Sequence, residues 1–67
     1  MPFAQMTESQ RASWLAWANS HDWGGEPAQW EGDALTVSTC AHTVQGGYFV
    51  EYYSAMTPAE LRAWAGY

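Results

Sequence analysis

The chain has 67 residues, of which 48% are hydrophobic and 16% aromatic, and this length allows one small domain. Seven acidic residues, two Arg and no Lys give a net charge of −5, which argues against direct binding of nucleic acid or of an anionic membrane, because both need clustered basic residues. The one Cys excludes an internal disulfide, and we expect neither a signal peptide nor a membrane-spanning helix from the apolar pattern.

The first predicted element is a helix that begins at about residue 8 and ends at residue 19 or 20, after a short lead-in of residues 1–6. Thr7 is a candidate N-cap, and Gln10 three residues later completes a capping box. The apolar residues of the segment recur at helical spacing and share one face. These residues are Trp14, Leu15 and Ala18, with Trp17 at the edge of the face.

A loop and three strands are predicted to follow the helix. Residues 21–27 contain two Gly and a Pro and therefore read as the loop. The strands are predicted at residues 28–31, 34–42 and 48–54, with turns at residues 32–33 and 45–47. In the second strand, Leu35 and Val37 alternate with Thr36 and Ser38, as expected for a strand with one buried face.

The sequence leaves the orientation of the third predicted strand open. In one arrangement Tyr48, Val50 and Tyr52 face the helices, so that Phe49 and Tyr53 lie on an uncovered sheet face. In the other arrangement Phe49 and Tyr53 face inward, and Tyr48 and Tyr52 are exposed instead. Both arrangements predict exposed aromatic rings on one face of the sheet.

A second helix is predicted at the end of the chain. Thr57 is its candidate N-cap, Pro58 occupies the first helical position, and Glu60 is expected to complete a capping box. The fold class predicted for residues 1–67 is therefore α+β, a small single compact domain. Its elements follow the order α-β-β-β-α, with a three-stranded antiparallel meander and two helices packed on one face.

Two groups of side chains have the residue types of catalytic or metal sites. Cys40 and His42 point to the same face of the second predicted strand, but they lie roughly 6–7 Å apart along it, too far for direct contact. A metal site formed by His21, Asp22 and Glu26, with or without His42, lacks the tight paired spacing of zinc ligands and the pattern of a calcium loop. We therefore expect no metal and no cofactor.

Pairs of carboxylates form a third group. Glu31 with Asp33, or Glu31 with Glu51, could act as general acid and base only in a pocket that raises one pKa. A sheet this small is expected to leave little room for a ligand pocket of about 300 Å³ or more. A glycine-rich phosphate loop is also absent, because both Gly-Gly pairs sit in predicted turns or loops. The sequence therefore predicts a protein that is not an enzyme.

The acidic residues are concentrated in one part of the sequence. Four of the seven lie within twelve residues, no basic residue separates them, and a fifth is on a neighbouring predicted strand. We expect these five to form one negative surface that attracts a basic protein partner. They are Asp22, Glu26, Glu31, Asp33 and Glu51. The alternative is that the net charge only keeps a tryptophan-rich protein soluble.

Exposed aromatic side chains are the second candidate binding feature, because aromatic residues are frequent at the centres of interfaces. The candidate anchors are Trp23, Phe49 and Tyr53. These rings could instead pack against the N-terminal segment, where Phe3 is available, or against a second copy of the chain in a homodimer.

In size, charge and compactness the chain resembles the small acidic proteins that phages and mobile elements encode to block host defence, anti-CRISPR inhibitors among them. The resemblance covers no motif and transfers no site residue. It implies an inhibitor that blocks a basic, nucleic-acid-binding host protein by steric and electrostatic mimicry. Immunity proteins and antitoxins that cap a toxin are similar in the same respects, and a self-associating accessory or structural protein is a further alternative.

The composition also bears on the source and the compartment. Eleven Ala without Ile or Lys favour a GC-rich bacterial or phage genome. One unpaired Cys fits a reducing environment. We therefore expect the chain in the cytoplasm of a bacterial host cell.

Overall fold

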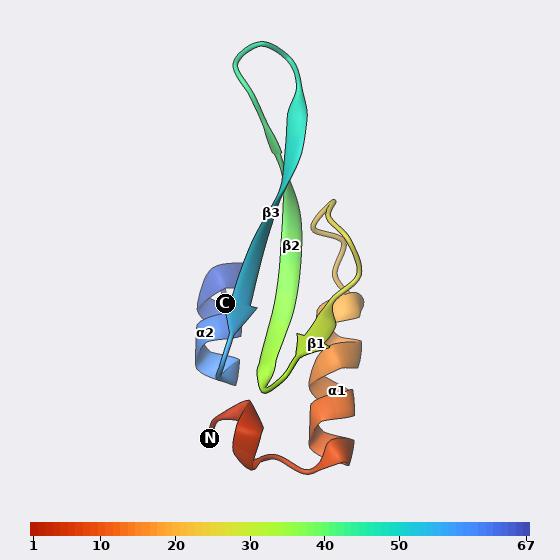
Figure 1. Cartoon of the computed structure of the whole chain (residues 1–67), viewed down its shortest axis with the longest axis vertical. Coiled ribbons are helices and arrows are strands. Elements are labelled where there is room, and N and C mark those ends of the chain that lie inside the picture. Colours follow the sequence, from red (N-terminus) through yellow and green to blue (C-terminus); the bar gives the residue numbers. More distant parts are fainter.

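The computed structural model describes all 67 residues, and its elements follow the predicted order α-β-β-β-α (Figure 1). They are η1, a 3-10 turn (Phe3–Gln5), α1 (Glu8–Asn19), β1 (Gln29–Glu31), β2 (Ala34–His42), β3 (Tyr48–Ala55) and α2 (Pro58–Ala65). The predicted α+β class with an antiparallel meander is confirmed, although β1 begins one residue later and β3 ends one residue later than expected. No helix is both long enough and apolar enough to cross a membrane.

The sheet has the order β1-β2-β3, and both pairs of neighbours are antiparallel. β2 and β3 are paired over eight consecutive residues of each strand without a bulge, ending at His42↔Tyr48. β1 pairs only with the beginning of β2, and an isolated bridge further along joins Gly24 to Thr39. Beyond this bridge β2 and β3 continue as a two-stranded hairpin that projects past every other element (Figure 1). We call residues 40–50 the arm and the rest of the chain the body.

Short polar contacts define where the helices begin. The predicted capping box of α1 is present: the Gln10 N–H donates to Thr7 Oγ1 at 3.2 Å, and the Thr7 N–H donates to Gln10 Oε1 at 2.9 Å. At α2 the box is only half formed. Thr57 Oγ1 accepts from the Glu60 N–H at 3.1 Å, but the Glu60 carboxylate accepts from the Met56 N–H, one residue before the cap. That carboxylate therefore satisfies a backbone donor just outside the helix.

The core lies on one face of the sheet, beneath both helices. Six fully or almost fully buried apolar residues form it: Phe3, Ala18, Leu35, Val37, Ala55 and Leu61. All five tryptophans pack around this cluster. The segment expected to be only a lead-in supplies the largest core side chain, because the Phe3 ring contacts those of Trp14 and Trp30 edge-on. Its N–H also donates to the carbonyl of Met56 at 2.9 Å, which holds the N-terminus against α2.

The register between β2 and β3 decides which face each aromatic residue occupies. Val37 pairs with Tyr53, so Tyr53 lies on the core face, and Ser38 pairs with Tyr52 on the opposite face. The arrangement in which Tyr48 and Tyr52 face the helices is therefore wrong, and the other arrangement is confirmed. The physical reason is that the strand period is two, so a shift of one residue in the turn would exchange the two faces.

Candidate functional site

Apart from Tyr52, the aromatic side chains of the body form one continuous cluster. Trp23 contacts Trp64 edge-on with ring centroids 4.8 Å apart, and Trp64 is stacked on Tyr53 at 6.1 Å. On its other side Trp23 is stacked against the ring of His21 at 5.0 Å. Two of the three candidate anchors, Trp23 and Tyr53, are thus half-buried by contacts within the chain, which leaves little of either ring to anchor a partner.

The arm presents a different set of side chains to solvent. Val44 at its tip is 98% exposed, Tyr48 is 74% exposed and Phe49 is 45% exposed. Tyr52, where the arm joins the body, is 58% exposed. Of the candidate anchors only Phe49 is exposed, and the two tyrosines on the helix-free face present more of their rings than it does.

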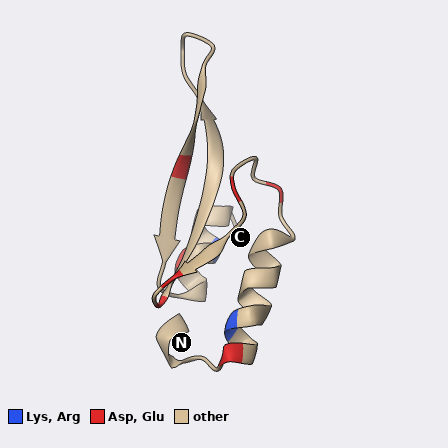
Figure 2. Ribbon diagram, turned by 45° about the vertical axis from the view of Figure 1, so that its right-hand side comes forward, with Lys and Arg blue, Asp and Glu red and all other residues tan.

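The acidic residues are all exposed, but the structure does not bring the five candidates onto one surface (Figure 2). Asp22 and Glu26 lie in the loop between α1 and β1, whereas Glu31 ends β1 and Asp33 lies in the β1–β2 turn. Glu51 pairs with Thr39 and shares the face of Val37 and Tyr53, because alternate strand residues point to the same side. The loop and Glu51 are therefore separate negative sites, and the arm carries no Asp, Glu, Lys or Arg at all.

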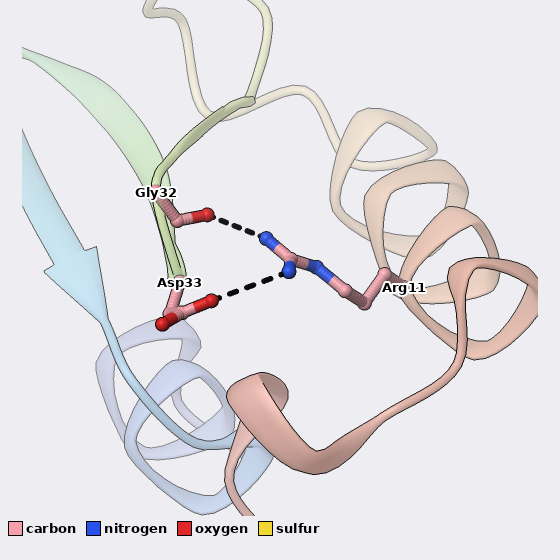
Figure 3. A network of polar contacts seen from close by, with 3 residues as sticks. All are labelled: Arg11, Gly32 and Asp33. Carbon is pink, nitrogen blue, oxygen red and sulfur yellow. Dashed lines mark hydrogen bonds and ion pairs between the residues drawn. The ribbon is translucent and has the colours of Figure 1, made fainter.

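Arg11 reaches across from α1 to the β1–β2 turn (Figure 3). Its guanidinium donates to the carbonyl of Gly32 and to Asp33 Oδ1, the latter at 3.4 Å, and it lies 4.1 Å from the centroid of the Trp30 ring. No basic residue lies within residues 22–33, but Arg11 from α1 neutralises part of the negative charge of this segment in the folded chain. Asp33 is paired within the chain and is less available to a partner than Asp22, Glu26 or Glu31.

The loop of residues 21–28 forms one wall of a cavity of about 360 Å³ that is open to solvent and lies against the end of α1 and the middle of β2. The expectation that so small a sheet leaves little room for a pocket of this size is wrong, because the loop and the helix end supply walls that the sheet alone does not. Asp22 and Glu26 both line the cavity, together with His21 and Trp23, and none of its lining residues is Lys or Arg.

Hydrogen bonds at Ser38 and Thr39 hold the loop on β2, and the Thr39 hydroxyl donates to the Trp23 carbonyl at 2.8 Å. The Glu26 N–H donates to Ser38 Oγ at 2.7 Å, and Ser38 Oγ donates to the Glu26 carbonyl at 3.1 Å. A Cβ at Gly25 would lie 2.6 Å from the carbonyl group of Ser38, so only glycine lets the loop come this close. The Glu26 carboxylate raises the pKa of Tyr52, mainly because it accepts a hydrogen bond from the Tyr52 hydroxyl. Desolvation of the hydroxyl and repulsion by the Glu26 charge raise this pKa further, each by a smaller amount.

The residues with catalytic side-chain types are not assembled into a reactive group. Cys40 is half-buried on the helix-free face beside Gly24, and His42 is exposed further along the same strand. His21 is held by the carbonyl of Trp17 through Nδ1 and by the hydroxyl of Tyr67 through Nε2, both at 2.8 Å. No three His, Cys, Asp or Glu side chains lie close enough together to hold a metal ion.

Comparison with protein-family models, with curated proteins and with solved structures finds no match to this chain. Its function is therefore inferred from its own surface, which has two distinct parts. The body is acidic and has a cavity lined by carboxylates, and the arm is uncharged and exposes aromatic rings.

Proposed function

We propose that the chain is a non-enzymatic binding protein that blocks a basic, nucleic-acid-binding protein by occupying the surface that would otherwise hold phosphates. Such an inhibitor is of the kind that phages and mobile elements use against host defence. All seven carboxylates are exposed, and the only ion pair in the chain joins Arg11 to Asp33. A basic partner would therefore meet an almost unopposed negative surface, which speeds association and favours basic partners over acidic ones.

The cavity under the loop is the single observation that carries this proposal. It combines two carboxylates, Asp22 and Glu26, with a volume that falls within the range of ordinary ligand pockets. A lysine or arginine side chain of the partner has the length and the charge to enter it. Asp22 Oδ1 accepts the Gly24 N–H at 3.0 Å, and this contact orients the carboxylate without neutralising it.

Charge reversal at the cavity tests the proposal. The chain is used as bait in bacterial lysate, and the affinity of a retained basic protein is then measured directly over a range of salt concentrations. The Asp22→Lys/Glu26→Lys variant should lose that protein, since each unfavourable charge contact replaces a favourable one. Reversal of Asp33 is a poorer test, because it would also break the contact with Arg11.

The Glu8→Lys/Glu31→Lys variant is the matched control. It changes the net charge equally, and both positions are exposed and lie outside the lining of the cavity. It should keep most of the affinity and most of the salt dependence. Equal losses from both variants would mean non-specific attraction by net charge, and unchanged binding by the cavity variant would contradict the proposal.

A further inference from the structure

The outer edge of β3 is open to another strand. β3 is an edge strand, and nothing lies beside its Tyr48–Tyr52 segment in either view of the fold (Figures 1 and 2). Natural proteins protect exposed edges with Lys, Pro, a bulge, a very short strand or a covering element. β3 has eight residues, contains neither Lys nor Pro, and is paired with β2 without a bulge. Its single charged residue is Glu51.

The backbone pattern shows which residues of β3 face this open edge. The Cys40 N–H donates to the Trp23 carbonyl, on the β1 side of β2. The N–H and C=O groups of successive strand residues point to alternate edges of the strand. In β2, those of the even-numbered residues therefore point towards β1 and those of the odd-numbered residues point towards β3. Every β2–β3 pair joins two even-numbered or two odd-numbered residues, so the odd-numbered residues of β3 bond to β2. The backbone N–H and C=O groups of the even-numbered residues of β3 therefore point to the open edge. Within the open segment these are Tyr48, Val50 and Tyr52.

We propose that a second copy of the chain pairs with this edge, antiparallel, about a two-fold axis at Val50. This register places Tyr48 opposite Tyr52 of the second copy, Tyr52 opposite its Tyr48, and Val50 opposite its Val50. All of these side chains lie on the helix-free face, and the two tyrosines are largely exposed in the single chain. Cross-strand aromatic and β-branched pairs of this kind stabilise a sheet.

The charges favour both this register and a second copy over a basic segment. An axis one residue further along would oppose Glu51 to Glu51 of the second copy, which is unfavourable, whereas the axis at Val50 puts Glu51 opposite Phe49. Antiparallel pairing also places the two acidic bodies at opposite ends of the joined sheet. A basic segment would find few counter-charges here, because six of the seven carboxylates lie outside β3.

The interface is a short ladder with a few side-chain pairs on one face. Stable protein interfaces bury about 1,200–2,000 Å², and five residues of edge strand from each copy bury less than that. The pairing should therefore be a reversible equilibrium between monomer and dimer. It should appear as the concentration rises and should not yield a permanent dimer.

Paired substitutions at the two tyrosines test the register directly. In sedimentation equilibrium, the wild-type mass should rise from 7.5 kDa towards twice that value as the concentration approaches the millimolar range. Tyr48→Lys/Tyr52→Lys should remove the dimer, because Lys then faces Lys twice, although the lower net negative charge would by itself favour association. Tyr48→Glu/Tyr52→Lys should restore the dimer in a salt-sensitive form, because position 48 faces position 52.

Several outcomes would overturn the proposal. One is a wild-type chain that stays monomeric at millimolar concentration. Another is a monomeric wild-type chain whose Tyr48–Tyr52 amide signals shift when a lysine-containing strand peptide is added, because the edge would then bind a different partner. Another is a Lys/Lys variant that dimerises like the wild type. Val44→Lys, at the exposed tip, is the control and should leave the dimer unchanged. Hydrogen exchange at the Val50 and Tyr52 amides of the wild type needs no variant and should slow as the concentration rises.

Discussion

The body and the arm share the same two strands but differ in what covers them. Within β2, Leu35 and Val37 are buried under the helices, whereas the hairpin that continues from the same strand ends at the almost fully exposed Val44. The body holds every charged residue and every tryptophan, and the arm holds none of either. The backbone ladder therefore continues into the arm, but the fully buried side chains that stabilise the fold are confined to the body.

The sharpest test of this contrast is the same substitution made once in each region. Phe3→Ala removes the largest core side chain and should destabilise the fold by about 3–5 kcal/mol. A chain of this length has a total stability of only about 3–10 kcal/mol, so this variant should be largely unfolded. Phe49→Ala, in the arm, should cost less than about 1 kcal/mol. Urea denaturation measures both, and similar losses would mean that the arm is part of the core.

Replacing one glycine by alanine in each region should give a smaller difference in stability between the body and the arm. Gly25→Ala would push a Cβ into the Ser38 carbonyl, and we expect a loss of about 1–3 kcal/mol together with displacement of the loop. Gly47→Ala, at the tip of the arm, meets only Thr43 Oγ1 at 3.3 Å and should change stability little. Thermal unfolding compares the two variants, and an unperturbed Gly25→Ala protein would show that the loop does not rest closely on β2.

The smallest expected effect lies at the junction of the two regions. Glu26→Gln removes the carboxylate that raises the pKa of Tyr52, so this pKa should fall towards the ordinary tyrosine value. The folded chain holds the Tyr52 proton to a higher pH than the unfolded chain does. The associated stability is therefore present below the ordinary pKa and is lost as the pH rises through the folded-state pKa. An NMR titration of Tyr52 measures the shift, and Glu51→Gln is the control that should leave it unchanged.

The parts of this comparison that follow from local sequence could be predicted, and the parts that depend on distant contacts could not. Thr7 and Thr57 begin helices because a cap needs only the residues next to it, and alternation within β2 is visible in the strand itself. The burial of Phe3 and the contact between Arg11 and Asp33 join residues far apart in the chain. No local pattern contains them.

The candidate site divides in the same way. The sequence identifies Asp22 and Glu26 as acidic loop residues, but the cavity that they line depends on how closely the loop approaches β2 at Gly25. The open edge of β3 depends on the order of the strands and on the β2–β3 register. The sequence therefore allows two orientations of β3, and only one of them exposes Tyr48 and Tyr52. The three-dimensional arrangement decides between the two.

The confinement of all five tryptophans to the body has a spectroscopic consequence. The indole rings of Trp14, Trp17, Trp23 and Trp64 form a chain of contacts with centroids 4.8–6.4 Å apart. At such separations their excited states couple, so the near-ultraviolet circular dichroism and the fluorescence of the protein report on the body as one unit. Fraying of the arm should leave the tryptophan contribution to both signals unchanged, so its opening has to be followed through the tyrosines or the backbone amides.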